Sequence, residues 1–345
     1  MFNSPAKKML FIVLLLLLFI TLSLQGVLQG PVDIDVNSVI KVLTAELYNS
    51  APDNIIKWQQ SIIIDVRLPR VIIAMFAGAS LALCGLVMQG MFRNPLASPS
   101  VLGVSSGASL GAVIAIYFGF SLLSAWAIPL FAFIGAGISL SIVYRIASHQ
   151  GQTNIATLLL AGVAISALNV AATSLLLALS LSNWDVARMI IYWTMGGLDG
   201  RTWDHVFIIL PTICSGFVLL LFYSKALDLL LLGEQHALSV GVDVKRTRRN
   251  LLIISTAMVG ASVSVVGGIG FIGLVVPHIL RLILGPSHRY LLPASLLGGA
   301  ITLIGADLFV SLFFKNSAIP LGVITAALGA PFFLFLLIKQ RVVIS

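Results

Sequence analysis

Ionisable residues are scarce in this chain, and two arginines stand close together ahead of a long apolar run. Arg67 and Arg70 are separated only by Leu-Pro. The planar guanidinium of arginine can hold carboxylates through paired hydrogen bonds. An arginine at a membrane surface can also extend toward lipid headgroups. Arg67 and Arg70 are therefore candidates for binding a carboxylate or a lipid headgroup.

The remaining reactive residues form no recognisable catalytic or metal site. His278 could bind metal or relay protons. No histidine, cysteine or carboxylate lies at helical ligand spacing around it, so we predict no metal centre. The chain has no Gly-x-x-x-x-Gly-Lys-Ser/Thr phosphate loop and no nucleophile–base or paired-carboxylate arrangement in its loops. We therefore predict a chain that is not an enzyme and binds no cofactor. Cys84 and Cys214 lie in apolar runs and are predicted to be buried thiols without a disulfide.

The composition places these residues in a membrane. Of the 345 residues, 59% are hydrophobic and 9% are charged, whereas a soluble domain usually carries about 25% charged residues. The apolar runs are too continuous for the alternating strands of a membrane barrel, and backbone groups in lipid must be satisfied within helices. The predicted fold class is an all-α polytopic membrane protein, a single transmembrane domain over residues 1–345.

About ten transmembrane helices are predicted, because a helix needs about 20 mostly apolar residues to cross the hydrocarbon core. The runs lie near residues 9–24, 69–92, 101–120, 127–146, 155–180, 204–225, 249–267, 271–284, 291–311 and 320–338. The first could be a signal peptide, but its length and the lack of a small-residue cleavage site favour a retained helix. Asn37-Ser38 is expected to cap a short amphipathic helix before the second span. Gly103, Gly107 and Gly111 recur every four residues and predict a face for close helix packing.

The distribution of charge predicts the orientation of the helices. With a cytoplasmic N-terminus, the inside loops contain 13 of the 20 basic residues and three of the 12 acids. This is the positive-inside bias of membrane proteins. Residues 31–68 are then an extracytoplasmic segment, residues 226–248 form a cytoplasmic loop, and both termini are cytoplasmic. The net charge of +8 is explained by these loops and by contact with membrane lipid, so we predict no nucleic-acid partner.

Several ordered motifs run from about residue 65 to the C-terminus. They are Arg67-Leu-Pro-Arg70, Gln89-Gly-Met-Phe-Arg-Asn-Pro-Leu-Ala97, Trp193-Thr-Met-Gly-Gly197, Leu232-Gly-Glu234, Val240-Gly-Val242, Gly270-Phe-Ile-Gly-Leu-Val-Val-Pro-His-Ile-Leu-Arg281, Ile319-Pro-Leu-Gly-Val323 and Gly329-Ala-Pro-Phe-Phe333. Their order over some 270 residues resembles the permease family of ABC importers for iron chelates, haem and cobalamin.

The resemblance implies a binding-protein-dependent ABC importer in the bacterial cytoplasmic (inner) membrane. The substrate is expected to be an iron–siderophore complex, or haem or cobalamin. Helices two to five and seven to ten would form an inverted repeat. Expected partners are a second permease copy or paralogue, two ATP-binding cassette subunits that hold ATP and Mg²⁺, and an extracytoplasmic substrate-binding protein.

The resemblance also implies roles for individual residues. Arg67 and Arg70 would pair with glutamates of the binding protein. A short coupling helix bracketed by glycines would contact the ATPase through Gly233, Glu234, Ala237, Val240 and Gly241. The cytoplasmic motifs contribute Arg93, Asn94, Pro95, Pro277, His278 and Arg281. The cluster Lys245, Arg246, Arg248 and Arg249 is better explained as a positive-inside anchor than as a contact site.

This chain departs from the family pattern at three positions. Ser311 replaces a frequent arginine, Ala318 a frequent glutamate, and Gly268 a frequent proline. The missing arginine leaves the docking of a binding protein to Arg67 and Arg70. An ion-coupled secondary transporter is the alternative function, but such proteins keep ionisable groups at mid-membrane, and the apolar runs are nearly free of acids away from their ends.

Overall fold

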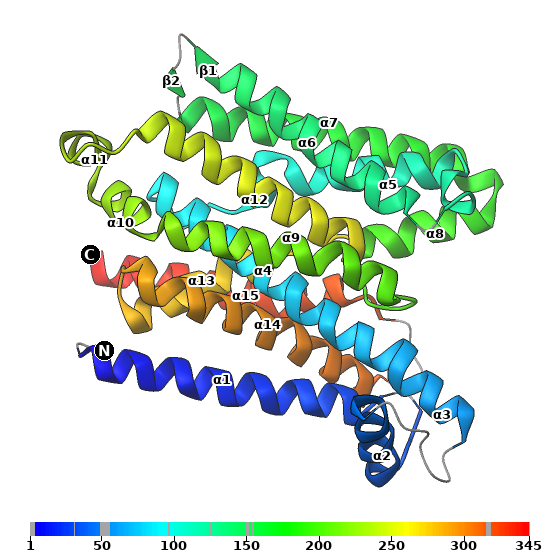
Figure 1. Ribbon diagram of the computed structural model, residues 1–345. Coiled ribbons are helices and arrows are strands. Elements are labelled where there is room, and N and C mark those ends of the chain that lie inside the picture. The colour runs from blue at the N-terminus through cyan, green and yellow to red at the C-terminus, as the bar shows by residue number, and fades with distance from the viewer. Residues whose placement is uncertain are drawn as a thin grey trace.

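The computed structural model describes residues 4–30, 32–48, 56–95, 97–124, 126–149, 152–153, 155–314 and 319–344. Apolar helices dominate this part of the chain, and ten of them run roughly parallel or antiparallel (Figure 1). They are α1 (Pro5–Leu28), α4 (Leu68–Phe92), α5 (Val104–Tyr117), α6 (Ala127–Ala147), α7 (Ile155–Leu179), α9 (Trp203–Phe222), α12 (Val244–Val266), α13 (Ile272–Leu284), α14 (His288–Phe313) and α15 (Leu321–Ile344).

Shorter elements connect these helices. They are α2 (Val36–Leu47), α3 (Lys57–Ser61), the π-helical η1 (Ile62–Arg67), the 3₁₀ segments η2 (Pro99–Leu102), η3 (Phe120–Leu122) and η4 (Ser180–Ser182), α8 (Trp184–Met195), α10 (Ser224–Leu232), α11 (Glu234–Ser239), and two-residue strands β1 (Ser148–His149) and β2 (Gln152–Thr153). The two strands pair antiparallel into a small hairpin.

Seven of the described helices are long and apolar enough to cross a membrane, and α5, α13 and the part Leu321–Leu334 of α15 add three shorter apolar segments. The predicted all-α polytopic fold is therefore confirmed. Both termini lie with α10, α11 and the hairpin at one end of the bundle, which we call the α11 end (Figure 1). The opposite end, with α2, α3 and the start of α8, is the α2 end. From the α2 end, α4 runs toward the α11 end, whereas α12 runs the opposite way, as an inverted repeat of α4–α7 and α12–α15 requires.

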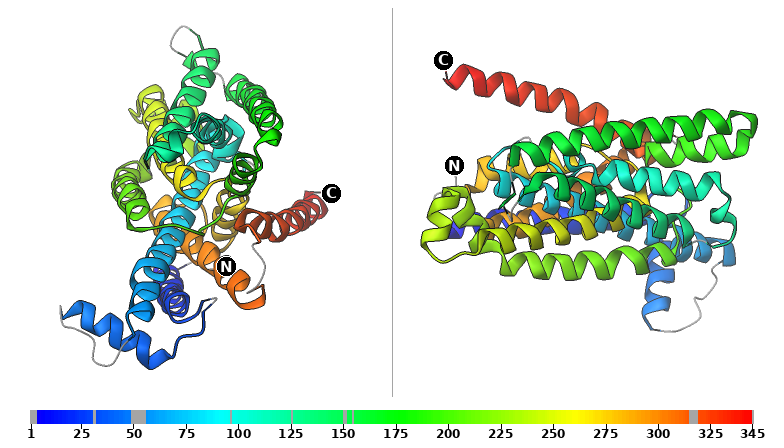
Figure 2. Two further views of the ribbon diagram at one scale, coloured as in Figure 1. Left: turned by 90° about the vertical axis from the view of Figure 1, so that its right-hand side faces the viewer. Right: turned by 90° about the horizontal axis from the view of Figure 1, so that it is seen from above.

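Helix α4 forms the centre of the bundle. In its most apolar stretch 83% of the residues are buried, against 6% for α1 at the periphery, and the views in Figure 2 show the other helices arranged around it. A Cβ on Gly78 would collide with the backbone of Gly299 in α14, and one on Gly85 would collide with the backbone of Gly273 in α13. Small residues thus let three helices approach to backbone contact, which is how helices associate in lipid.

The predicted glycine face on α5 is confirmed in the same way. Cβ atoms on Gly107 and Gly111 would collide with backbone oxygens of Gly135 and Phe131 in α6. Gly103 instead caps the start of α5 in the left-handed conformation, with φ of 78°. Two helices therefore pack closely through two of the three predicted glycines.

Replacing Gly85 by alanine should destabilise the folded chain by about 2 kcal/mol, because the added methyl group forces α4 and α13 apart. The matched control is Gly137→Ala, since a Cβ on Gly137 in α6 meets no heavy atom within 4 Å. The control should be neutral or slightly stabilising, because alanine favours the helix. Thermal unfolding in detergent compares the two variants, and equal melting temperatures would refute the packing argument.

Two sequence predictions need correction. The amphipathic helix before the second span is present as α2, but Asp35 caps it by accepting a hydrogen bond from the Asn37 backbone N–H at 3.1 Å. The predicted cap, Asn37-Ser38, lies inside the helix. Cys84 is buried as predicted, whereas Cys214 is exposed on the surface of α9. A thiol in an apolar run can face lipid as readily as the core, since hydrophobicity alone does not distinguish them.

Candidate functional site

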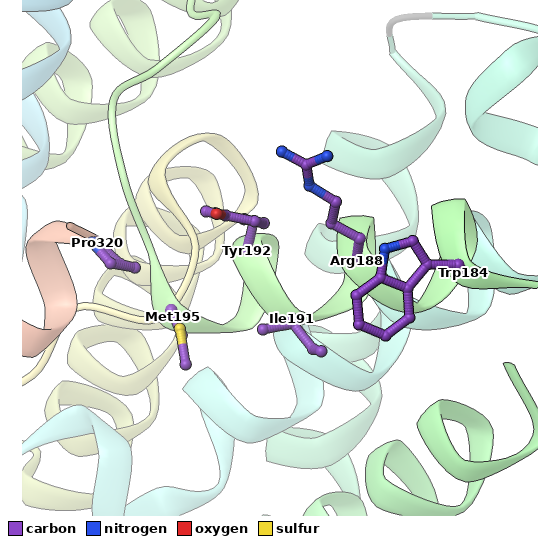
Figure 3. A pocket seen from close by; sticks show the side chains of 6 residues that line it. All are labelled: Trp184, Arg188, Ile191, Tyr192, Met195 and Pro320. Atoms are coloured by element: carbon purple, nitrogen blue, oxygen red, sulfur yellow. The ribbon is translucent and has the colours of Figure 1, made fainter. Parts of the chain in front are cut away.

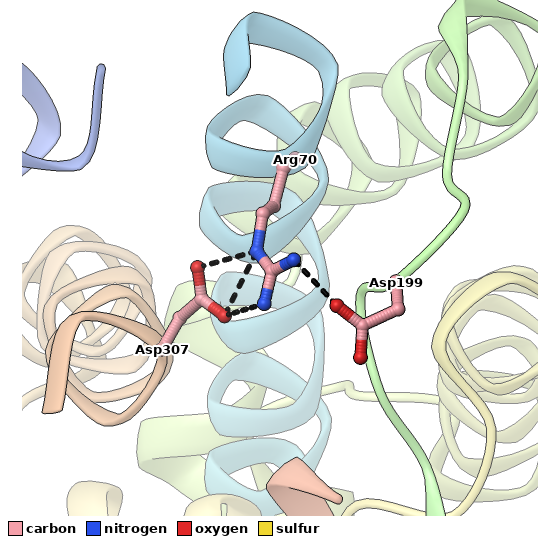
Figure 4. A network of polar contacts seen from close by, with 3 residues as sticks. All are labelled: Arg70, Asp199 and Asp307. Carbon is pink, nitrogen blue, oxygen red and sulfur yellow. Dashed lines mark hydrogen bonds and ion pairs between the residues drawn. The ribbon is translucent and has the colours of Figure 1, made fainter. Parts of the chain in front are cut away.

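The most connected charged group lies at the α2 end and joins three separate segments. Arg70, in the first turn of α4, donates from Nε to both carboxylate oxygens of Asp307 at 3.1 and 3.0 Å and from Nη2 to Oδ1 at 2.8 Å. Its Nη1 donates to Asp199 at 2.6 Å. Figure 4 shows the guanidinium between the two carboxylates, one from α14 and one from the loop after α8. This cluster ties α4 to both neighbours.

Asp307 lies near the end of α14 and forms an ion pair with Arg70. The side chains of Arg70 and Asp307 are 19% and 10% exposed, whereas that of Asp199 is 77% exposed. The Arg70–Asp307 pair is thus largely withdrawn from solvent, and the Asp199 contact faces outward. The sequence places Arg70 and Asp307 on the same side of the membrane. This placement could have suggested the pairing, because charged groups in a membrane protein usually form ion pairs.

The side chain of Arg67 is buried within the folded protein. It is 4% exposed, and its guanidinium donates to the backbone oxygens of Val27, Leu28 and Val32. Cations that bind the last carbonyls of a helix satisfy groups that have no partner within it. Arg67 therefore secures the end of α1 and the segment after it.

Two cavities open beside α8. A cavity of about 480 Å³ is lined by Trp184, Arg188, Ile191, Tyr192, Met195 and Pro320. Figure 3 shows Arg188, Tyr192 and Trp184 along one helix, with Pro320 across the opening. A second cavity of about 300 Å³ shares Tyr192 and Pro320 and extends to Asp199 and Arg201. Burial lowers the pKa of the Arg201 guanidinium, and Asp199 opposes that shift.

Helix α8 is a short element that the sequence motifs did not reveal. Asn183 caps its start by accepting from the Val186 backbone N–H, and Gly196 ends it with φ of 73°. Cβ atoms on Gly268 and Gly322 would press on the backbone oxygens of Thr194 and Met195. Glycine at 268, where the family often has proline, therefore permits a close approach to the end of α8.

At the α11 end, α10 and α11 project from the bundle (Figures 1 and 2). Gly233, with φ of 125°, separates α10 from α11, and Gly241 follows α11 with φ of 87°. The predicted glycine-bracketed helix is thus present. Ala237 is buried with Leu230 and Val244 in a small separate core. This core holds the two short helices together against the start of α12.

The outer surface of this projection is apolar. Leu232, Leu238 and Val240 are 68%, 50% and 58% exposed, although they lie outside the long spans. Apolar groups exposed away from lipid commonly mark a protein interface. Of the predicted contact residues, Val240 is therefore on the surface, whereas Ala237 faces inward.

Arg248 is not the membrane anchor that the sequence suggested. It is buried, and its Nη2 lies 3.2 Å from Glu234 Oε2. The pair joins α12 to the first turn of α11. The predicted anchoring role fails for this residue because the turn at Gly241 folds α11 back toward α12.

A second buried contact connects α10 to α14. The His288 side chain is fully buried, its Nδ1 lies 2.6 Å from Asp228 Oδ1, and its backbone N–H donates to the same oxygen at 2.8 Å. Burial would raise the pKa of the Asp228 carboxyl, but the hydrogen bonds from His288 lower it below its usual range. No local pattern in the sequence indicates this pair, because 60 residues separate its members.

The predicted cytoplasmic motif residues gather near this end of the bundle. Helix α4 ends at Phe92, and Arg93 follows in the left-handed conformation with φ of 50°, before Asn94 and Pro95. A Cβ on Gly233 would lie 3.8 Å from Arg93 Nη1, so this motif lies beside the turn between α10 and α11. Pro277 and His278 are buried in α13, as is Nε of Arg281. Among the described residues, no group of three or more His, Cys, Asp or Glu could hold a metal ion.

Known proteins agree with this arrangement. The chain matches the FecCD transport family over residues 14–339. It is 37% identical to the hemin transport permease HmuU of Yersinia pestis, covering 98% of each chain, and 38% identical to the Fe(3+)-citrate import permease YfmD of Bacillus subtilis, covering 98% of this chain and 97% of that one. It is 46% identical to the cobalamin import permease BtuC of Halobacterium salinarum, covering 82% of this chain and 75% of the relative.

A solved structure of a metal-chelate type ABC transporter in an inward-facing conformation is similar as well. It superposes with a TM-score of 0.83 at 31% identity, over 95% of this chain and 99% of that one. The protein is a permease subunit of an ABC importer, a multi-span protein of the cytoplasmic (inner) membrane, and it belongs to the FecCD transport family. Its family places ATP hydrolysis in a separate subunit and implies a partner ATPase and a substrate-binding protein.

Proposed function

We propose that the chain imports a complete metal chelate, an iron–siderophore complex or else haem or cobalamin, with energy from ATP hydrolysed by its partner subunits. The observation that carries this proposal is similarity at 37–46% identity to import permeases for hemin, Fe(3+)-citrate and cobalamin. The lack of a metal-ligand group among the described residues favours recognition of the chelate over binding of a bare ion.

The α11 end is proposed to face the cytoplasm, with both termini. The loops that the charge distribution predicts to be cytoplasmic lie at the α11 end, and positively charged loops remain in the cytoplasm. Segment 226–248, which holds α10, α11 and the start of α12, would contact the ATPase through Gly233, Glu234, Ala237, Val240 and Gly241. Its buried members position the helix, and its exposed apolar members make the contact. Segment 31–68 then faces outward, at the α2 end.

A second copy or paralogue of the chain is proposed to complete the pathway on the side of α8 and the start of α15. The two cavities open there, beside Tyr192 and Pro320. Pathways in transporters built from inverted repeats lie where the repeats meet, which supports this side as the route of the substrate.

Binding-protein docking is proposed to depend on Arg70, with Arg67 holding the preceding segment in place. Asp199 is exposed and bonds only one nitrogen of the Arg70 guanidinium, so a glutamate of the binding protein could replace it. Ser311, in place of the frequent arginine, lies in α14 one turn after Asp307, and Ala318 lies outside the described residues.

Replacing Asp199 by asparagine should therefore strengthen binding of the substrate-binding protein about threefold to tenfold, because it frees Arg70 for an incoming carboxylate. Surface plasmon resonance on the permease–ATPase complex in nanodiscs measures the affinity. Lys41→Gln in α2 is the control for a change of charge at the same end. An unchanged or weaker affinity of the Asp199 variant would refute docking at Arg70.

The importer function is tested by purifying the chain from gently solubilised native membranes and reconstituting what accompanies it in liposomes. We expect a phosphate-loop ATPase at a 1:1 ratio and ATP-dependent uptake of an ⁵⁵Fe-siderophore, haem or cobalamin when the binding protein is added. Movement of solute under an ion gradient without ATP would instead establish a secondary transporter.

A further inference from the structure

Arg188 is a positively charged residue on a surface that is otherwise lined by apolar and aromatic side chains. It lies in α8 beside the larger cavity, and the guanidinium carbon is 5.6 Å from the centre of the Tyr192 ring. No ion pair of 4.0 Å or less joins it to a carboxylate among the described residues, and Asp185, one turn earlier, is exposed. Arg188 is itself exposed, so its guanidinium is accessible to a carboxylate of a ligand in the cavity.

The charges beside the smaller cavity balance one another. The charge of Arg70 is neutralised by Asp307 and Asp199 together, and these three groups leave one excess negative charge. Arg201 lines the same cavity as Asp199 and offsets that charge, but its Nε is buried without a hydrogen-bond partner. Among the residues that line the two cavities, Arg188 and Arg201 are positively charged and Asp199 is negatively charged, which leaves a net charge of +1.

The apolar part of the surface suits a bulky ligand. Trp184 and Tyr192 stand on either side of Arg188 along α8, and Met195 and Pro320 close the far side (Figure 3). Aromatic and thioether groups bind apolar or planar ligand surfaces without demanding one geometry. A guanidinium among them adds a directional contact for carboxylates.

We propose that this surface contacts the substrate during import and selects an anionic metal chelate, whose carboxylates bind Arg188 and Arg201 and whose remaining surface lies against Trp184, Tyr192 and Met195. The inference rests on the proposed importer function and narrows its substrate class to chelates with peripheral negative charge. Neutral chelates lack a group that could compensate Arg188. Since the metal is already coordinated within the chelate, the surface needs no ligands for the ion itself.

The test compares two ferric complexes of opposite character, the anionic citrate complex and the neutral hydroxamate complex ferrichrome. Binding of each ⁵⁵Fe-labelled probe to the detergent-solubilised permease–ATPase complex is measured by equilibrium dialysis. We expect ferric citrate to bind at least about tenfold more tightly than ferrichrome, in a salt-dependent manner. Arg188→Gln should lower the affinity for ferric citrate about tenfold and leave the affinity for ferrichrome unchanged. Arg188→Lys should have an affinity for ferric citrate between those of the original protein and Arg188→Gln.

Two controls locate the effect. Lys41→Gln removes a positive charge at the same end of the bundle but away from the cavities, and should leave both affinities unchanged. Quenching of tryptophan fluorescence by ferric citrate should decrease in Trp184→Phe, since this ring lies against the bound chelate.

The outcomes separate this inference from the proposed function. Equal affinity for the two probes, or undiminished ferric citrate binding by Arg188→Gln, overturns the anionic selectivity even if ATP-driven uptake of a neutral chelate is observed. Arg188-dependent binding of ferric citrate supports the site, and if ATP then drives no uptake, only the importer function fails.

Discussion

Asp307→Ala is expected to destabilise the folded chain by about 3–5 kcal/mol, because it leaves the guanidinium of Arg70 in a largely buried position without its main partner. Three of the four hydrogen bonds that Arg70 makes to carboxylates go to Asp307. The loss also weakens the contact between α14 and α4, two helices that pack extensively against each other. Water reaches this position poorly, since the Asp307 side chain is 10% exposed.

Thermal unfolding in detergent, with purified monodisperse protein, measures this effect. Asp199→Asn is the matched control, because its exposed carboxylate bonds the same guanidinium and its loss should cost at most about 1 kcal/mol. If Asp307→Ala folds too poorly to be purified, the double variant Arg70→Met/Asp307→Leu provides the second measurement. It should recover most of the stability, since a buried ion pair can be replaced by apolar groups of similar size. Equal losses in the Asp307 and Asp199 variants would refute the account.

Leu238→Glu should separate the permease from its ATPase and abolish ATP-driven uptake. Leu238 is half exposed on α11, and a charge there would be buried against the partner without a counter-ion. Central apolar contacts in an interface contribute about 2 kcal/mol or more, which corresponds to about a 30-fold loss of affinity. The fold should be unaffected, because surface substitutions usually change stability by less than about 0.5 kcal/mol.

The measurement is the amount of ATPase that co-purifies with the tagged permease, together with ATP-dependent uptake in liposomes. Gln235→Glu is the control, since it adds the same charge to an exposed position of the same helix. Ala237→Leu should act differently from both, because Ala237 is fully buried against Leu230 and Val244. It should displace α11 and lower the melting temperature. Normal recovery of the ATPase with Leu238→Glu would place the contact elsewhere on the chain.

The long spans were predictable because their signal is local. Continuous apolar runs of membrane length have only one way to satisfy their backbone in lipid, which is a helix. The predicted runs at 69–92, 127–146 and 155–180 match α4, α6 and α7 closely. Helix α8 was not predicted, because its 12 residues are too short to span and carry Asp185 and Arg188. The run at 204–225 was likewise extended past Phe222, where α9 ends and α10 soon begins.

The candidate sites could be predicted from the sequence only where all their residues lie in one short continuous segment. The glycine-bracketed helix at 234–240 is of this kind, and the structure places α11 there. Arg67 and Arg70 were also identified from the sequence, but the two residues between them do not indicate their partners. One guanidinium closes the end of α1 and the other joins α14, 237 residues away.

The amino-acid sequence by itself determined that this chain crosses a membrane as about ten helices. It also determined which loops carry most of the positive charge and which family the chain resembles. Each of these follows from composition or from order along the chain. Only the tertiary structure decided that Asp307 neutralises Arg70, that Asp228 holds His288, and that Arg188 stands beside a cavity whose described lining residues include no carboxylate. Such pairs depend on helix packing, and close packing depends on backbone contacts between distant glycines, whose partners no local pattern specifies.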